Sequence, residues 1–283
     1  ELLDSKGKVI ESWTSTTKPH VINNLKAGTY TIREKVAPKG YLLAEDIEFT
    51  IDAEGNITGS TIMQDDYTKV EISKKDIVTS EELPGATLQV IEKSTGKVLE
   101  EWTSTAEPYK INKLPIGEYI LREITAPDGY VRAEDVEFKV DKTGEIQRVE
   151  MKDDYTKVEI TKKDLETKEI LKGAQLQLLD SQGDVVAEFT SENKAYTISK
   201  LPVGEYTLHE VKAPKGYNLA EDVKVVIEET GKVQEFSIYD VEKTNNVPIS
   251  KQDITTGEEI EGARLELLDS KGKVIESWTS TTK

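Results

Sequence analysis

The sequence predicts an all-β protein in which two-sheet antiparallel β-sandwich domains follow one another as an elongated rod, and three observations support this prediction. First, one short segment occurs three times, at residues 70–76, 158–164 and 247–253. A period of about 88 residues (158 minus 70) is too long for a solenoid repeat and suits a small domain. Second, short runs in each repeat alternate apolar and polar residues, which is typical of half-buried strands. Third, glycine-containing turn sequences such as Thr95-Gly96 separate these runs.

The repeats divide the chain into four units with short connections. Residues 1–18 are identical to residues 266–283, which predicts that the chain begins and ends inside copies of one domain. We therefore expect a partial domain without its first strand, two complete domains, and the N-terminal part of a further domain, at residues 1–68, 69–156, 157–245 and 246–283. The third connection, near residues 244–246, is longer than the second, which makes it the expected hinge of an otherwise semi-rigid rod.

Composition argues against several classes of function. The net charge is −17, so the chain would repel nucleic acid phosphates and anionic membrane surfaces. It contains no cysteine and only two histidines, His20 and His209, which argues against thiolate catalysis and a histidine-rich metal centre. No apolar run is long enough to span a bilayer. We therefore expect no cofactor, no nucleic acid partner, no membrane contact by this segment and no enzyme activity with turnover.

Three charged residues in each complete domain are predicted to point into the core. Because side chains alternate between the two faces of a strand, Lys74 lies on the same face as Val70 and Ile72. By the same parity, Glu123 and Asp153 continue the apolar faces of two later strands. The equivalent residues in the other units are Lys162 and Lys251, Glu34 and Glu210, and Asp65 and Asp240.

A lysine, a glutamate and an aspartate in one core must neutralise their charges, because burying an unpaired charge is costly. Two outcomes are open. The three side chains can form a buried ion-paired cluster, which stabilises a core only weakly. Alternatively, burial can favour the neutral amine and the neutral carboxyl group, so that the lysine attacks the carboxyl carbon of the aspartate while the glutamate transfers protons. The products would be water and an amide, that is, an intramolecular isopeptide bond.

Sequence motifs around these positions resemble those of the B-type repeat domain of Gram-positive collagen adhesins. This domain is also called SpaA-like, or prealbumin-like (transthyretin-like), and it has an inverse Ig-like β-sandwich fold. The motifs are Ile-Ser-Lys-Lys-Asp at residues 72–76, Ala-Pro-x-Gly-Tyr at residues 126–130 shortly after Glu123, and an aspartate followed closely by a tyrosine at residues 153–155. The resemblance covers nearly the whole chain. Many members use asparagine as the acceptor, whereas this chain has aspartate.

The resemblance also implies a chemistry and a function. It implies two isopeptide bonds, Lys74 to Asp153 with Glu123 as the catalyst and Lys162 to Asp240 with Glu210 as the catalyst. Family members serve as stalk or backbone modules of wall-anchored adhesins and pili. We therefore expect an extracellular structural spacer on the surface of a Gram-positive bacterium, whose partners are the neighbouring repeats of its own chain. The alternative is that the repeats themselves bind a host matrix protein such as collagen.

The two partial units contain unmatched members of the triad. Glu34 and Asp65 lie in residues 1–66, where no first-strand lysine precedes them. Lys251 lies in residues 247–283, which contain neither the matching glutamate nor the matching aspartate. An open sheet edge can accept a strand from another chain. We therefore expect Lys251 of one chain to link to Asp65 of a second chain, with Glu34 as the catalyst.

Overall fold

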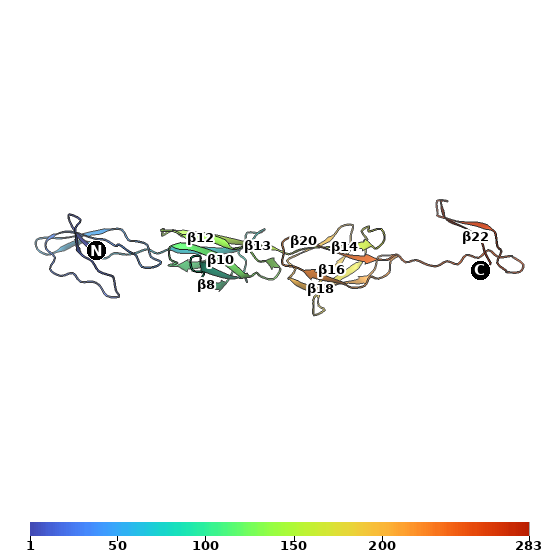
Figure 1. The fold of residues 1–283 in the computed structure, drawn as a ribbon, viewed down its shortest axis with the longest axis horizontal. Helices are drawn as coiled ribbons and strands as arrows, with labels where there is room; N and C mark the ends of the chain where they lie inside the picture. Colours follow the sequence, from blue (N-terminus) through green and yellow to red (C-terminus); the bar gives the residue numbers. More distant parts are fainter. Residues whose placement is uncertain (283) are drawn as a thin grey trace.

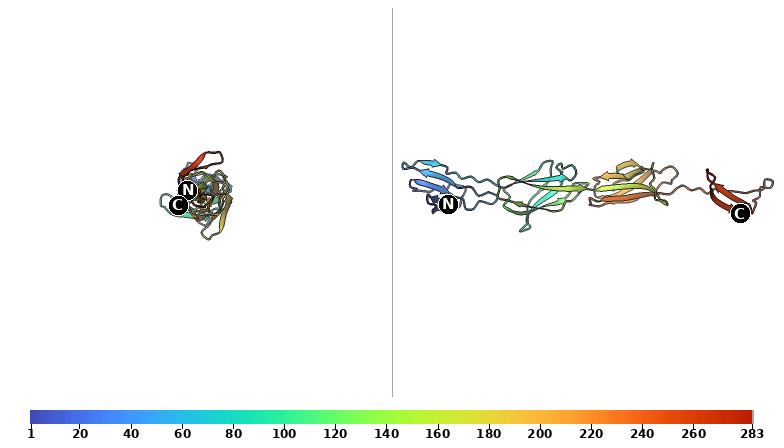
Figure 2. Two further views of the ribbon diagram at one scale, coloured as in Figure 1. Left: turned by 90° about the vertical axis from the view of Figure 1, so that its right-hand side faces the viewer. Right: turned by 90° about the horizontal axis from the view of Figure 1, so that it is seen from above.

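The computed structural model describes residues 1–282, and it shows four units arranged end to end in a narrow rod (Figure 1). Viewed along the rod, the units overlap in a small cross-section (Figure 2). All elements of regular secondary structure in the described residues are β-strands, from β1 (Leu2–Asp4) to β22 (Val274–Thr279). No helix that could cross a membrane occurs in this part of the chain. The prediction of tandem all-β domains is confirmed.

The second unit contains two four-stranded sheets. In the first sheet the strands are antiparallel and their order is β12-β10-β7-β8. In the second sheet the order is β11-β13-β6-β9. The bounds are β6 (Lys69–Asp76), β7 (Thr87–Glu92), β8 (Val98–Thr103), β9 (Tyr109–Asn112), β10 (Gly117–Thr125), β11 (Tyr130–Val131), β12 (Val136–Val140) and β13 (Ile146–Tyr155).

One pairing differs from the antiparallel prediction. The first and last strands of the unit, β6 and β13, are parallel, with Lys74 opposite Met151 and Asp76 opposite Asp153. Alternation of apolar residues predicts which face a side chain takes, but it carries no information on strand direction. The parallel pairing means that the chain enters the unit at one end and leaves it at the other, which is what allows successive units to extend as a rod (Figure 1).

The third unit repeats this design. Its sheets have the orders β16-β15-β18-β19 and β17-β14-β20, and its first and last strands, β14 and β20, are again parallel. The bounds are β14 (Lys157–Asp164), β15 (Gln175–Leu179), β16 (Val185–Thr190), β17 (Tyr196–Ser199), β18 (Gly204–Lys212), β19 (Val223–Ile227) and β20 (Val233–Asp240).

The hydrophobic core of each complete unit lies between its two sheets. In the second unit it includes Ile72, Leu88, Leu121 and Met151, which are almost completely buried. Burial alternates residue by residue along β6, so that Lys74 occupies a core position on the same face as Ile72. Apolar burial of this kind is the main favourable contribution to folding. The core therefore fixes the register of the strands that contain the predicted triad.

The first and fourth units contain only one sheet each. The first unit has the order β2-β1-β3-β4-β5, and the fourth consists of the hairpin β21-β22. The bounds are β2 (Val9–Glu11), β3 (Gly28–Ile32), β4 (Ile47–Ile51), β5 (Ile57–Gly59) and β21 (Arg264–Leu268).

The missing second sheet in the outer units has a simple cause. In a complete unit the first strand lies between two partners, as β6 lies between β13 and β9. Residues 60–66 of the first unit correspond to most of β13, and they form no strand because no first strand lies beside them in the described chain. Residues 247–251 of the fourth unit likewise form none, since both partners are missing. The first strand is therefore required for the second sheet to form.

Candidate functional site

Three strands bring the predicted triad of the second unit together. Lys74 lies on β6, Glu123 near the end of β10, and Asp153 near the end of β13. The ammonium Nζ of Lys74 contacts Oδ1 of Asp153 directly and lies 3.0 Å from Oε1 of Glu123. The three side chains are at most 1% exposed. Because β10 belongs to the opposite sheet, the glutamate approaches the Lys74–Asp153 pair across the core.

The third unit has the same arrangement. Lys162 Nζ contacts Oδ1 of Asp240 and lies 2.8 Å from Oε1 of Glu210. All three side chains are fully buried. Two independent copies of the triad therefore have the same donors, acceptors and surroundings, although the sequences of the two units differ at many other positions.

A β-bulge and a backbone amide position the glutamate. The pairing of β10 with β7 is irregular directly after Glu123, because Thr125 pairs with the residue next to the partner of Glu123. Bulges of this kind are common next to functional sites, where they redirect a side chain. The amide N–H of Ala133 then donates a 2.7 Å hydrogen bond to Oε2 of Glu123. This leaves Oε1, the oxygen that faces Lys74, free to exchange a proton.

Sequence reasoning missed this support, although a signal for it was present. The tripeptide Ala-Glu-Asp occurs at residues 44–46, 133–135 and 220–222. Its alanine N–H binds the glutamate in all three units, at 2.7–2.8 Å. Its aspartate pairs with the residue just before the glutamate, and in the second unit Asp135 accepts three hydrogen bonds from Arg122, at 2.6, 3.0 and 3.2 Å. The repeated tripeptide therefore anchors the loop against β10 beside Glu123.

Burial sets the protonation state of the aspartate. It raises the pKa of Asp153 to about 7, against the opposing effect of Lys74 and with a smaller contribution from the charge of Glu123. The same causes raise the pKa of Asp240 to about 6. Burial therefore favours the neutral form of both carboxyl groups relative to an exposed aspartate, and a neutral carboxyl group is a better electrophile than a carboxylate.

In the noncovalent arrangement, several buried carboxyl oxygens lack a well-oriented hydrogen bond, although the lysine nitrogens lie within ion-pair distance of the glutamate oxygens. Four carboxyl oxygens in the two triads, one on each acidic side chain, have no hydrogen-bond partner among the described residues: Glu123 Oε1, Asp153 Oδ2, Glu210 Oε1 and Asp240 Oδ2. Unsatisfied buried polar atoms cost free energy. A proton on one carboxyl group of each triad would supply a donor to the other. Formation of an amide would remove one carboxyl oxygen as water.

This geometry can form an amide by a balanced sequence of steps. Transfer of one proton from the Lys74 ammonium to the Asp153 carboxylate gives a neutral amine and a neutral carboxylic acid. The amine nitrogen attacks Cγ of Asp153 and forms the N–C bond, while Glu123 accepts a proton from the nitrogen. Glu123 then gives this proton to the departing hydroxyl group as the C–O bond breaks. One water molecule leaves, and Glu123 returns to its starting state.

The remaining predicted site residues are not brought together. Oε2 of Glu34 accepts a 2.8 Å hydrogen bond from the Ala44 amide, as in the complete units. Asp65 follows it in the first unit on a segment that forms no strand, and Lys251 lies in the fourth unit, at the far end of the rod (Figure 1). No cluster of three or more metal-ligating side chains occurs among residues 1–282.

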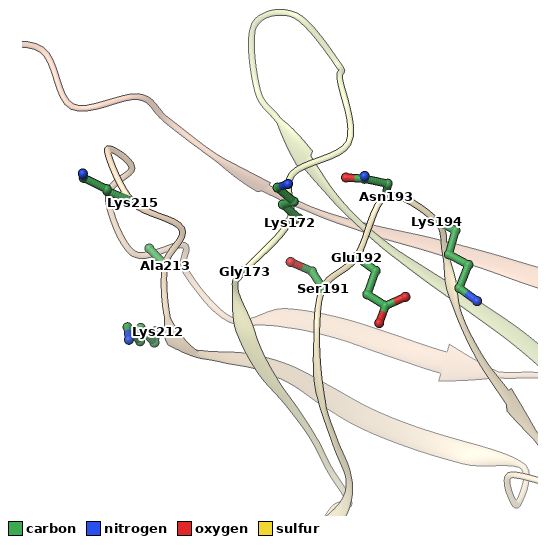
Figure 3. A pocket seen from close by; sticks show the side chains of 9 residues that line it. All are labelled: Lys172, Gly173, Ser191, Glu192, Asn193, Lys194, Lys212, Ala213 and Lys215. Atoms are coloured by element: carbon green, nitrogen blue, oxygen red, sulfur yellow. The ribbon is translucent and has the colours of Figure 1, made fainter.

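The triads are closed to outside molecules, and a surface hollow of the third unit lies away from them. A hollow of about 930 Å³ in the third unit contains none of the six triad residues. It lies beside the loops around Ser191 and Ala213, and four lysines line it: Lys172, Lys194, Lys212 and Lys215 (Figure 3). The buried triad can therefore act on its own side chains but offers no space for an external substrate.

The comparison with protein families matches three successive segments of the chain. The family model described as the SpaA prealbumin-like fold domain matches residues 1–66, 68–155 and 156–242. A search of curated proteins found no match. Among solved structures, the TIE protein of Bacillus anthracis is 21% identical, with a TM-score of 0.47 over 98% of this chain. This chain spans 56% of the length of that protein.

Two pilins are also similar at low identity. The shaft pilin SpaA of Lactobacillus rhamnosus GG is 15% identical, with a TM-score of 0.32, over 64% of this chain and 98% of the pilin. A streptococcal ancillary pilin is 17% identical, with a TM-score of 0.31, over 78% of this chain and 77% of the pilin. The family match covers three consecutive segments and most of the sequence. The chain therefore belongs to the family of SpaA prealbumin-like fold domains.

Proposed function

We propose that this chain is a stalk segment of an extracellular surface protein of a Gram-positive bacterium, either a pilus shaft or an adhesin. Each complete unit is closed by an intramolecular isopeptide bond, Lys74 to Asp153 in the second unit and Lys162 to Asp240 in the third. The observation that carries the proposal is the direct, buried contact between the lysine and the aspartate, with a glutamate 3.0 Å or less from each lysine nitrogen. The reaction occurs once per unit, so the chain is not an enzyme with turnover.

The position of the bond suits a stalk. Lys74 and Asp153 lie on the first and last strands of the unit, which are parallel neighbours, and both lie near the end at which the chain leaves the unit. Tension applied to the two ends of the rod would pass from β6 through the amide into β13. The part of the chain between the two linked residues, which are 79 positions apart, would then carry no tension. A stalk of this kind transmits force without lengthening, and it requires no ligand of its own.

An immobilised-ligand assay separates the stalk from the alternative function. We expect the purified chain to show no saturable binding to immobilised collagen, because a spacer needs no recognition surface. A chain that contains an adhesive domain serves as the positive control. Saturable binding at micromolar concentration would contradict a purely structural role.

The lysine-lined hollow is the observation that favours the alternative, a repeat that binds a host matrix protein. The chain has a net charge of −17, yet four lysines gather here. The corresponding positions of the second unit are Pro84, Glu107, Thr125 and Asp128. If collagen binds here through its acidic side chains, replacing the four lysines by glutamate is expected to abolish binding, because like charges repel each other. Binding that survives this change would exclude the hollow as the site.

We extend the proposal to the partial units, which are expected to complete each other between chains. The segment around Lys251 has no partner strand within the described chain, and the segment around Asp65 lacks the strand that would lie beside it. Head-to-tail pairing does not close on itself and produces linear oligomers. At high concentration the chain should form ladders that resist boiling in detergent, and Lys251→Arg should eliminate them. Absence of ladders from the parent chain would refute this extension.

A further inference from the structure

The end of the second unit forms a polar cluster with the third. Lys200, in the loop between β17 and β18, extends its Nζ to within 2.7 Å of Oδ2 of Asp76. The same nitrogen lies 2.5 Å from the hydroxyl of Tyr130 and 4.8 Å from the centre of its ring. The Tyr130 hydroxyl donates a 2.7 Å hydrogen bond to Asp76. An ammonium group, a carboxylate and an aromatic ring from two units therefore contact each other at one point.

Backbone contacts fix the same junction. Thr156 is completely buried between the units. Its N–H donates a 3.0 Å bond to the carbonyl of Gly129 in the second unit, and its hydroxyl donates a 2.6 Å bond to the carbonyl of Leu201 in the third. A Cβ atom on Gly129 would lie 2.2 Å from the carbonyl oxygen of Lys200, so only glycine permits this approach.

The junction between the first and second units repeats these contacts. Thr68 is buried, and its hydroxyl donates a 2.5 Å bond to the carbonyl of Leu114. Lys113 contacts the Tyr41 hydroxyl and lies 4.5 Å above its ring. Both loop lysines have a positive φ, 65° for Lys113 and 62° for Lys200. Two junctions with different flanking sequences therefore use the same conformation and the same donors.

The Asp76–Lys200 pair, at the junction between the second and third units, differs in its protonation from the lysine–aspartate pair of the triad. Burial would raise the pKa of Asp76, but hydrogen bonds from Lys200, from two backbone amides and from Tyr130 lower it well below its usual range. The Lys200 pKa is raised, chiefly by Asp76. Both groups therefore stay charged, and the lysine has no neutral amine to attack the carboxyl group. The contact is a noncovalent ion pair.

The junction after the third unit lacks the buried threonine, although Asp164, Gly216 and Tyr217 occupy the positions of Asp76, Gly129 and Tyr130. Counting from the triad aspartate, Glu242 and Lys243 replace Tyr155 and Thr156. The Lys243 N–H still donates a 2.8 Å bond to the carbonyl of Gly216, but its side chain has no hydroxyl group to bond to a following unit. In Figure 1 an extended segment without strands separates the third unit from the fourth, whereas the second and third units abut.

We propose that these contacts form a docking interface that fixes the angle between successive units, and that residues 243–247 are a hinge that lacks it. The interface fits one kind of partner, a Lys-Leu-Pro loop in the next unit of the same chain whose lysine has a positive φ. Here it is present at Lys113 and Lys200. The rod is therefore stiff from the first unit to the third and flexible before the fourth.

Distances between spin labels test this proposal directly. The chain has no cysteine, so labels can be attached to cysteines introduced at Lys97, Gln182 and Lys271, which are exposed and occupy equivalent turns in the second, third and fourth units. Pulsed electron paramagnetic resonance should give a narrow distance distribution for the pair 97 and 182, and a broad one for the pair 182 and 271. Distributions of equal width in the parent chain would overturn the proposal.

Variants of the interface make the test specific. Thr156→Val combined with Lys200→Ala should broaden the 97–182 distribution until it resembles that of the 182–271 pair. Lys200→Ala alone, which changes a partly exposed side chain, should broaden it less and keeps the test valid if the double variant unfolds. Lys224→Ala removes an exposed ion pair with Glu205 in the same unit and should have no effect. A narrow distribution in both interface variants would refute the docking interface.

Discussion

Replacement of Glu123 by glutamine is expected to leave Lys74 and Asp153 unjoined while the second unit still folds. Glutamine has nearly the same shape and can still accept the hydrogen bond from the Ala133 amide. It cannot accept a proton from the amine and return it to the departing hydroxyl group. The purified variant should therefore be lighter than the mass calculated from its own sequence by one water molecule, whereas the parent chain should be lighter by two.

The loss of this bond should greatly reduce stability. The linked residues are 79 positions apart, and the chain-entropy relation used for cross-links assigns a loop of this length about 4.5 kcal/mol. For a domain of this size, the melting temperature of the second unit should fall by roughly 20 °C or more. Scanning calorimetry measures this change.

The matched control is Glu118→Gln, on the same strand but with an exposed side chain. It should change neither the mass deficit nor the melting temperature. The unmodified third unit provides an internal reference within the same scan. If Glu123→Gln retains the full mass deficit of the parent chain, Glu123 does not transfer the protons.

Stretching of single molecules should show the second large effect. In the parent chain both complete units are expected to resist extension, because a covalent bond joins the strands that receive the force. In Lys74→Arg the second unit should unfold under tension. The 79 residues released, at about 3.4 Å each, correspond to a step of about 270 Å in contour length.

The arginine substitution is informative because it changes little except the chemistry. Arginine keeps the positive charge and the hydrogen-bond donors, but it is not deprotonated in proteins and cannot form the amide. Lys75→Arg is the control, since Lys75 lies on the outer face of β6 and pairs with Glu150 at 2.5 Å. It should show no step. A 270 Å step in the parent chain would contradict the proposed role of the bond.

The sequence predicted which charged residues are buried better than it predicted how their strands are arranged. Strand parity alone placed Lys74, Glu123 and Asp153 inside the core, because burial depends mainly on the two-residue period of a strand. Parity could not indicate that β6 and β13 are parallel. It also could not indicate that the triad lysine and aspartate would lie on neighbouring strands, since pairing depends on contacts between segments far apart in the chain.

Other features were outside the reach of local patterns. The bulge after Glu123 depends on the register between β10 and β7, and the Ala133 amide approaches only because its loop is anchored on Arg122. The junction contacts join residues 124 positions apart in the case of Asp76 and Lys200. The repeated Ala-Glu-Asp tripeptide was the one sequence signal that could have revealed the support of the glutamate.

The incomplete sheets of the outer units show a further limit of predicting strands from the sequence alone. Residues 60–66 have nearly the same strand-like composition as the end of β13, yet they form no strand. The strand propensity of these residues is not sufficient to form a strand, because the backbone groups of a strand need a neighbouring strand to satisfy their hydrogen bonds. Strand formation in this fold is therefore a property of the complete unit.

The mass of the intact, purified chain tests the central claim most directly. Each isopeptide bond removes one water molecule, so the measured mass should be lower than the mass calculated from the sequence by two water molecules. Digestion should then yield branched peptides that join Lys74 to Asp153 and Lys162 to Asp240. A mass equal to the calculated value, with both lysines recovered in linear peptides, would show that the triads are buried ion pairs and would contradict the account.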